Sequence, residues 1–276
     1  MKHFISLNST TLSKDEKQHL QLDNVTGVIL YGRNIRSLKT TKEFIKTIKA
    51  VKQSLAIAID EEGGIVSRFT HIIPNFSEPY CATLPDNEIR KYYRMRSEFL
   101  KDLGIDVNFA PVVDIAFEEN STMFKRSYGS TPENVTRPAQ ICLEEQKRAG
   151  IASCLKHFPG HGRTTTDSHD ELPIINITMS DWESSEMKVY KHLIQMEPEY
   201  IMIGHLLYPK IDLTISSLSK FWVKEVLRDK LQYKGKIISD DICMDAIDSQ
   251  NLSENQLDEI GLDSAIIDST DHILLK

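Results

Sequence analysis

Residues 151–169 read IASCLKHFPGHGRTTTDSH, an apolar run followed by a loop dense in reactive side chains. The run 151–158 has the length of a strand and contains no turn former, whereas Pro159 and the glycines after it prevent regular structure. We therefore expect Lys156 and His157 at the carboxyl end of a buried strand, with the following residues in a loop above it.

Asp167 and His169 lie two residues apart in this loop. In an extended or turning segment, that spacing lets the carboxylate hold one ring nitrogen of the imidazole and leaves the other nitrogen facing a substrate. A histidine held in this way can act as a general acid and base near neutral pH.

Two alternatives apply to the same side chains. His157, His161, His169 and Asp167 could ligate zinc or iron, or the histidines could be incidental members of a glycine-rich loop. The spacing matches no common ligand pattern, and the density of reactive groups disfavours the second alternative. We therefore expect neither a metal nor another cofactor.

Length and composition narrow the class of protein. With 276 residues and 40% hydrophobic content, the chain can form one large α/β domain or two small ones. The net charge of −7, the pI near 5.7 and the absence of a lysine or arginine cluster argue against a nucleic-acid partner. The four cysteines show no paired spacing, so we expect them as reduced core residues.

The amino-terminal apolar run is too short for a signal peptide, and no later segment approaches the length of a membrane span. We therefore expect a cytoplasmic protein with no membrane partner.

Short apolar runs alternate with longer helical patterns along almost the whole chain, which is typical of a parallel α/β fold. The predicted strands are 3–7, 27–31, 55–60, 106–113, 151–158, 200–206, 236–240 and 272–275. Eight strands predict a (β/α)8 TIM-type barrel that forms a single domain over residues 1–276. Because the last predicted strand ends beside Lys276, we expect the final helix to be missing. A homodimer contact or the amino-terminal segment would then cover the apolar surface beside strands one and eight.

Start and stop signals support the helices between these strands. Helices are predicted at 87–103, 133–149 and 220–233, among others. The signals are predicted capping boxes at Ser13 with Glu16, Ser180 with Glu183 and Ser253 with Gln256, a predicted cap at Thr131 before Pro132, and left-handed stops at Gly104, Gly150 and Gly235.

Polar residues follow five of the predicted strands: Asp60, Glu61, Glu62, Asp114, Lys156, His157, His205, Asp240 and Asp241. Barrel enzymes build their active sites at this face, although each acid alone could equally be a helix cap. Strand alternation predicts that only one of Asp240 and Asp241 faces the mouth, and it does not say which. A carboxylate opposite a histidine–aspartate pair suggests acetal chemistry, in which the carboxylate attacks and the histidine protonates the leaving oxygen.

These motifs resemble the family-three glycoside hydrolases, and within them the single-domain bacterial β-N-acetylglucosaminidases of peptidoglycan recycling. The likeness runs from about Gly27 to the end of the chain. Its motifs read ILYGRNI at 29–35, AIDEEGGIVSRF at 58–69, NFAPVVD at 108–114, RSYG at 126–129, KHFPGHGRTTTDSH at 156–169 and ISDD at 238–241. The sequence departs from the usual pattern at Glu61, where glutamine is common, at Phe124-Lys125 and at Thr214-Ile215.

The resemblance implies a retaining exo-β-N-acetylglucosaminidase acting on small saccharides with a terminal β-linked N-acetylglucosamine. It implies Asp240 as the nucleophile that forms a glycosyl-enzyme, and His169 as the acid/base with Asp167 as its partner. It also implies that the −1 sugar is held by Asp60, Arg68, Arg126, Lys156 and His157. Because a neutral imidazole repels an anionic acceptor less than a carboxylate does, phosphorolysis is an alternative to hydrolysis. A barrel that binds sugar without turnover is another.

Overall fold

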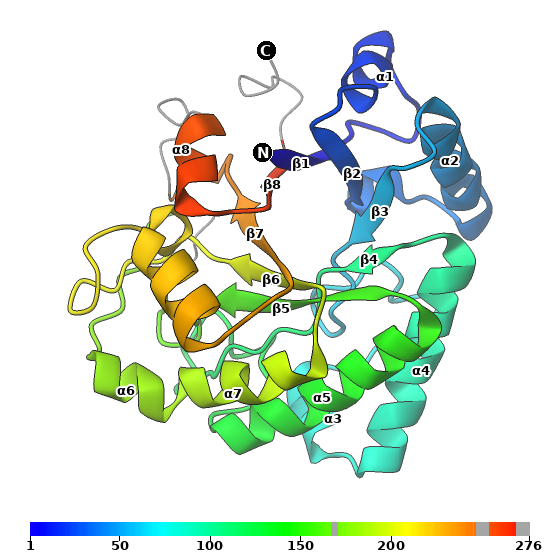
Figure 1. Ribbon diagram of the computed structural model, residues 1–276. Helices are drawn as coiled ribbons and strands as arrows, with labels where there is room; N and C mark the ends of the chain where they lie inside the picture. The colour runs from blue at the N-terminus through cyan, green and yellow to red at the C-terminus, as the bar shows by residue number, and fades with distance from the viewer. Residues whose placement is uncertain (167–170, 245, 247–253, 269–276) are drawn as a thin grey trace.

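The structure, a computed structural model, describes residues 1–166, 171–244, 246 and 254–268. Eight parallel strands follow one another around a closed barrel, and the eighth pairs with the first. Helices surround the strands (Figure 1), so the predicted TIM-type barrel is confirmed. The strands are β1 (Lys2–Ser6), β2 (Val25–Leu30), β3 (Ala56–Ile59), β4 (Val107–Asn108), β5 (Ala152–Phe158), β6 (Tyr200–Ile203), β7 (Lys236–Asp241) and β8 (Ser264–Ile267).

The barrel interior is filled by side chains from all eight strands, as alternation along closed strands requires. Three aromatic rings meet there edge to face: Phe4 lies 5.6 Å from Phe109 and 6.0 Å from Tyr200, between ring centroids. Gly27 makes room for Phe4, because a Cβ at this position would lie 2.3 Å from the ring. These rings form the aromatic floor of the barrel, a term used below for Phe4, Phe109 and Tyr200.

The outward sides of the strands pack beneath the helices in two larger apolar clusters. The helices are α1 (Lys14–Leu20), α2 (Leu38–Val51), α3 (Glu78–Thr83), α4 (Asp86–Leu103), α5 (Pro132–Ala149), α6 (Met179–Ser184), α7 (Glu186–Leu193), the π-type helix η4 (Phe221–Lys230) and α8 (Glu254–Ile260), with short turns η1 (Gly32–Asn34), η2 (Ile194–Met196) and η3 (Ser216–Leu218). Helices α4 and α5 lie side by side against the outer wall (Figure 1). Within the described residues, no helix has the length and apolarity needed to span a bilayer.

Several predicted helix ends are confirmed. Ser13 and Glu16 form a capping box, and the side chain of Thr131 caps α5 with Pro132 in its first turn. Gly104 and Gly150 end α4 and α5 with φ values of 99° and 72°, a left-handed conformation that costs a residue with a side chain more than glycine.

Other predicted ends are wrong. The capping box of α6 is formed by Thr178 and Asp181, two residues before the predicted pair Ser180 and Glu183. Gly235 does not end a helix in the left-handed region. A side chain does not fit at position 235, because its Cβ would lie 2.3 Å from the hydroxyl of Tyr233. The predicted cap at Ser253 lies outside the described residues.

Two predicted strands differ from the structure. The fourth was expected over 106–113, but β4 contains two residues, because the N–H of Ala110 turns back to the carbonyl of Asn108 at 2.8 Å. The eighth was expected over 272–275, which lies outside the described residues, whereas β8 is Ser264–Ile267. Asp263 and Ser264 interrupt the apolar pattern there. Asp263 nevertheless fixes the register, because its carboxylate accepts the backbone N–H of Ile237 at 2.7 Å.

Cysteine burial also differs in part from expectation. Cys81, Cys142 and Cys154 are free and buried, whereas Cys243 is exposed.

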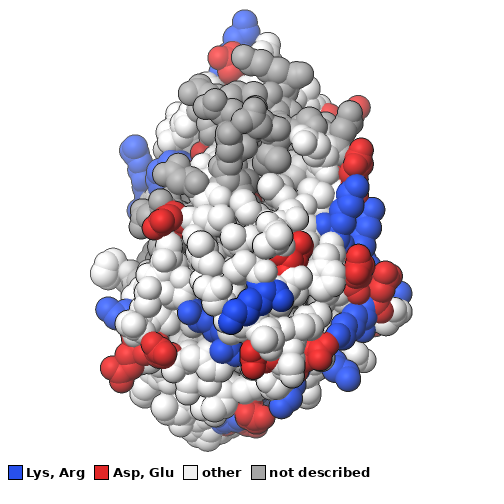
Figure 2. All heavy atoms as spheres, turned by 90° about the vertical axis from the view of Figure 1, so that its left-hand side faces the viewer, with Lys and Arg blue, Asp and Glu red and all other residues white. Residues whose placement is uncertain are grey.

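On the face drawn in Figure 2, cationic and anionic side chains lie interspersed and form no continuous basic surface.

Candidate active site

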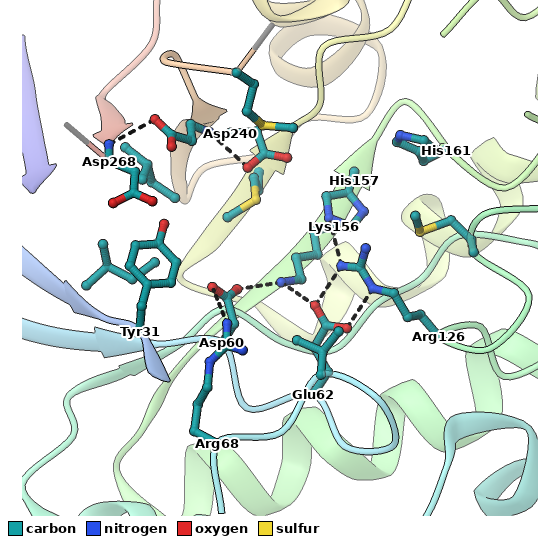
Figure 3. Close-up of a pocket in the computed structure, with 17 residues that line it drawn as sticks. Tyr31, Asp60, Glu62, Arg68, Arg126, Lys156, His157, His161, Asp240 and Asp268 are labelled. Carbon is teal, nitrogen blue, oxygen red and sulfur yellow. Dashed lines mark hydrogen bonds and ion pairs between the residues drawn. The ribbon is translucent and has the colours of Figure 1, made fainter. Parts of the chain in front are cut away.

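A cavity of about 280 Å³ opens at the carboxyl ends of the strands (Figure 3). Its volume is at the small end of known ligand pockets, roughly 300–1,000 Å³. Six of the residues predicted for the site line it: Asp60, Arg68, Arg126, Lys156, His157 and Asp240. The predicted pair Asp167 and His169 lies outside the described residues.

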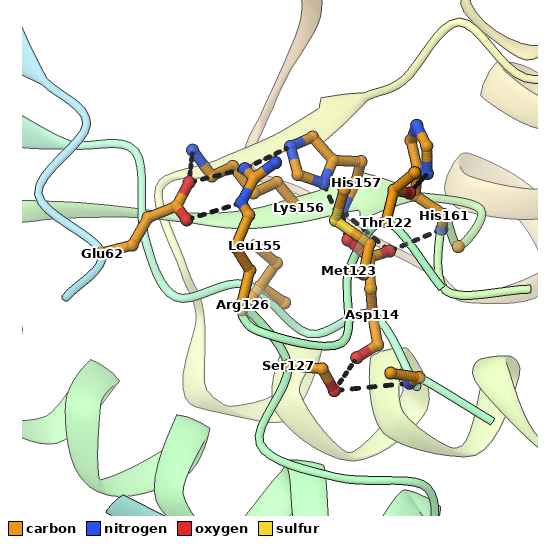
Figure 4. Close-up of polar contacts among 12 residues, drawn as sticks. Glu62, Asp114, Thr122, Met123, Arg126, Ser127, Leu155, Lys156, His157 and His161 are labelled. Carbon is orange, nitrogen blue, oxygen red and sulfur yellow. Dashed lines mark hydrogen bonds and ion pairs between the residues drawn. The ribbon is translucent and has the colours of Figure 1, made fainter. Parts of the chain in front are cut away.

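Glu62 connects two cations in one wall of the cavity (Figure 4). Arg126 donates to both of its carboxylate oxygens, at 2.8 and 2.9 Å, and Lys156 Nζ lies 2.6 Å from Oε1. Lys156 also donates to Asp60 Oδ1 at 2.6 Å. Burial alone would raise the pKa of Glu62, but Arg126 and Lys156 outweigh it and hold the pKa well below its usual range. The wall therefore contains a fixed network of two anions and two cations.

Asp114 lies next to His157 and orients its ring (Figure 4). Its carboxylate is fully buried, 2.7 Å from His157 Nδ1, and it accepts the backbone N–H groups of His157 and His161. Burial raises the pKa of Asp114, but His157, His161 and the backbone N–H of His161 lower it by more. The pKa therefore lies below its usual value. An ionised Asp114 accepts a hydrogen bond from Nδ1–H, which directs Nε2 of His157 toward Arg126, 3.4 Å away.

Asp240 and Asp241 both line the cavity, and Asp241 Oδ1 also accepts the backbone N–H groups of Cys243 and Asp268 in the following loops, each at 3.0 Å. The pairing of β7 with β8 shifts register between Ser239 and Asp241, and a bulge of this kind breaks the alternation of side chains. Asp240 Oδ1 accepts the backbone N–H of Asp241 at 2.9 Å. Burial raises the pKa of Asp240, but His157, His205, this N–H and Lys156 together bring it below its usual value.

His205 supports this strand end from outside the cavity. It is fully buried, with Nε2 2.9 Å from the backbone carbonyl of Asp241 and Nδ1 2.7 Å from the hydroxyl of Ser217. Because a carbonyl can only accept, Nε2 donates, and Nδ1 then accepts from Ser217. His205 was expected at the polar mouth, and the structure instead places it behind the backbone of Asp241.

Arg68 and Tyr31 complete the opposite side of the cavity (Figure 3). The Arg68 guanidinium lies 3.9 Å from Asp60 Oδ2, and its centre is 6.0 Å from the Tyr31 ring. Burial, with nearby carboxylates such as Asp60 and Asp241, raises the pKa of Tyr31 well above its usual value. Its phenol is therefore a neutral hydrogen-bonding group.

Sequence reasoning placed Glu62 and Asp114 at the polar strand ends without a specific role, and it did not single out Tyr31. Alternation could have identified Glu62, because residues two apart on an extended chain share a face and Asp60 was already a candidate. Asp114 was noted as a strand end, but its contacts with His157 and His161 join segments 43 and 47 residues apart. No local pattern contains that information.

The titration of Asp241 gives a test of this geometry. Burial, with the charges of Asp268 and Asp240, raises its pKa to about 6. A raised pKa contributes stability below the unfolded value near 4, and that stability is lost as the pH rises through 6. Asp241→Asn cannot titrate, so at pH 7 it is expected to exceed the wild type by about 1–2 kcal/mol in free energy of unfolding. Urea denaturation between pH 4.5 and 7 measures this difference, and a difference that does not grow with pH would contradict the assignment.

The arrangement suits a neutral ligand with many hydroxyls. Carboxylates that are already paired with cations can still accept hydrogen bonds, and Arg68 and Arg126 can still donate. Asp240 is an ionised carboxylate with no salt-bridge partner among the described residues, so it can act as a nucleophile. Within the ranges the structure describes, no group of three or more His, Cys, Asp or Glu side chains is arranged to hold a metal ion.

Comparison with known proteins gives matching results for sequence and structure. Residues 3–271 match the glycosyl hydrolase family 3 N terminal domain. A beta-hexosaminidase of Shewanella frigidimarina is 33% identical over 249 residues, which cover 87% of this chain and 73% of that protein. Native NagZ from Neisseria gonorrhoeae superposes with a TM-score of 0.90 at 27% identity, covering 98% of this chain and 81% of that one. The same protein in complex with N-trifluoroacetyl-D-glucosamine gives a TM-score of 0.89 at 26% identity over 98% of this chain and 84% of that one.

Proposed function

Because the chain belongs to glycosyl hydrolase family 3 and is a glycoside hydrolase of the beta-hexosaminidase kind, we propose that it is a retaining exo-β-N-acetylglucosaminidase. The observation that carries this proposal is the ionised, half-buried carboxylate of Asp240 in the lining of a small cavity that opens at the strand ends. A carboxylate held in this way can attack an anomeric carbon from the face opposite the leaving group.

The proposed reaction has two steps. In the first, Asp240 Oδ forms a bond to the anomeric carbon, the glycosidic C–O bond breaks, and His169 gives a proton to the leaving oxygen. In the second, His169 takes a proton from water, the water oxygen attacks the same carbon, and the bond to Asp240 breaks. Asp167 holds the imidazole of His169 in the required tautomer.

The other predicted residues bind the terminal sugar. Asp60 is held by Lys156 and is able to accept from ring hydroxyls, while Arg68 and Arg126 donate from either side of it. His157 contributes Nε2, which Asp114 directs toward the cavity wall that contains Arg126. Support for an acetamido sugar comes from a relative whose complex contains N-trifluoroacetyl-D-glucosamine.

The first experiment compares hydrolysis of an aryl β-N-acetylglucosaminide with that of the matching aryl β-glucoside, with and without chelator and with and without added phosphate. Chelator-resistant turnover of the acetamido sugar alone is expected. Acceleration by phosphate would favour a phosphorylase. Binding of N-acetylglucosamine without turnover of either aryl sugar would favour a barrel that only binds sugar.

Loss of Asp167 gives a separate test of the acid/base. Asp167→Asn is expected to lower kcat most for sugars with poor leaving groups, since these need the proton most. A series of aryl N-acetylglucosaminides of increasing leaving-group pKa measures the dependence. The wild-type rate is expected to fall at both pH extremes, and a pH profile that survives His169→Ala unchanged would exclude this histidine as the acid/base.

The biological setting is part of the same proposal. We infer a cytoplasmic enzyme that acts on muropeptide-type fragments of peptidoglycan, because the sequence motifs resemble those of bacterial recycling enzymes. We also propose a homodimer, and sedimentation analysis of the purified chain tests it.

A further inference from the structure

Glu61 lies between Asp60 and Glu62, but its side chain points away from the cavity, as alternation along the chain predicts. Its carboxylate is fully buried and accepts from three donors. The Ser67 hydroxyl donates to Oε1 at 2.5 Å, the backbone N–H of Arg68 donates to Oε2 at 2.6 Å, and the Arg96 guanidinium donates to Oε1.

These contacts close a short loop over residues 61–69. The loop turns back at Gly63 and Gly64, whose φ values are 125° and 51°, and Val66 exchanges backbone hydrogen bonds with Gly63 at 2.9 and 3.2 Å. The second half of the loop then contacts the carboxylate of Glu61, the residue at which the loop begins. The backbone of Arg68 is therefore fixed by Glu61, and its side chain extends from there into the cavity.

Arg96 supplies the countercharge from helix α4. Its side chain is 3% exposed, it donates to the carbonyl of Pro74 at 3.1 Å, and its guanidinium lies 4.9 Å from the ring centre of Tyr92. Among the described residues, Glu61 is the only carboxylate paired with it. A buried guanidinium needs such a partner, so the pair ties the loop to the outer helix.

We infer that Glu61 is a positioning residue for Arg68, and that it acts as an anion. This inference rests on the proposed function, because Arg68 is assigned to the terminal sugar. All three neighbours of the carboxylate are donors, and a carboxylate offers acceptors only. A glutamine would place an NH₂ group against one of these donors, so the amide is not a conservative replacement here.

The test measures the dissociation constant of N-acetylglucosamine by calorimetry for the wild type, Glu61→Gln, Arg68→Ala and the double variant. Glu61→Gln is expected to weaken binding about tenfold, since the donor groups of Arg68 move away from the sugar. In the Arg68→Ala background, Glu61→Gln is expected to leave the dissociation constant unchanged, because the side chain through which Glu61 acts is gone.

A matched control separates positioning from stability. Glu145 is also buried, at 2% exposure, and it pairs with Arg90, Arg94 and Arg148 on the outside of the barrel. Glu145→Gln is expected to lower the unfolding midpoint in urea while leaving sugar binding within about twofold of the wild type.

Each outcome decides between the alternatives. The positioning role alone would be overturned if Glu61→Gln bound the sugar as tightly as the wild type. It would also be overturned if the increases in dissociation constant caused by Glu61→Gln and Arg68→Ala multiplied in the double variant. Should Glu61→Gln fail to fold, Glu61→Asp keeps the charge with a shorter reach. An intermediate loss of binding is then expected, and wild-type affinity would overturn the role. A wild type that neither binds nor hydrolyses these sugars would overturn the proposed function and this role together.

Discussion

Replacing Asp240 by alanine is expected to lower kcat/KM for an aryl β-N-acetylglucosaminide by on the order of 10⁴–10⁶, because the bond to the anomeric carbon can no longer form. Its carboxylate is an ionised group in the cavity that has no salt-bridge partner among the described residues. Release of the chromophore measures the loss, and circular dichroism confirms that the variant is folded.

A small anion distinguishes a lost nucleophile from a damaged site. Azide fits the space that the carboxylate vacates, and in the alanine variant it should restore cleavage of an activated substrate. The product should be the glycosyl azide of inverted configuration, since one displacement replaces two. Asp241→Asn serves as the neighbouring comparison and is expected to keep a far larger share of activity. The reverse ranking of the two variants would assign the nucleophile to Asp241.

Replacing Glu62 by glutamine is expected to lower the free energy of unfolding by about 3–5 kcal/mol at neutral pH, because it removes one partner of a buried ionic network. Arg126 would lose its carboxylate, and Lys156 would keep only Asp60. Displacement of these cations should also lower kcat/KM by about 100-fold.

The pH dependence of that loss has a defined sign. The pKa of Glu62 is depressed in the folded protein, so its contribution is present above the unfolded value near 4.3 and is lost as the pH falls. The gap between wild type and variant in urea should therefore be widest at pH 7 and should shrink below pH 4.5. Glu43→Gln, on the exposed side of α2, is expected to change stability by no more than about 0.5 kcal/mol. A comparably small change at Glu62 would mean that the network is not ionised.

The sequence predicted the barrel because its strands are short apolar runs between capped helices, and that information is local. It failed at β8, where Asp263 and Ser264 interrupt the apolar pattern and Asp263 bonds the backbone of β7, and at β4, where the N–H of Ala110 turns back to Asn108. Boundaries of this kind depend on partners that lie elsewhere in the chain.

For the site, the sequence predicted which residues meet but not the contacts that support them. Six proposed residues meet in one cavity, since strand ends converge in any closed parallel barrel. The two roles of Asp240 and Asp241 could not be separated by alternation, because a register shift lies between Ser239 and Asp241. Likewise, the support given by Asp114 and His205 comes from contacts across the fold, which no spacing along the chain encodes.

The aromatic floor described above closes the barrel interior on the side away from the mouth of the cavity. Phe4, Phe109 and Tyr200 fill the barrel axis, and so a ligand cannot pass through it. A sugar released in the proposed reaction must leave by the opening through which it came, before the next chain end can enter. Substrate binding and product release therefore use the same opening. At high sugar concentration, the turnover rate is expected to depend on release of the monosaccharide as well as on cleavage of the glycosidic bond.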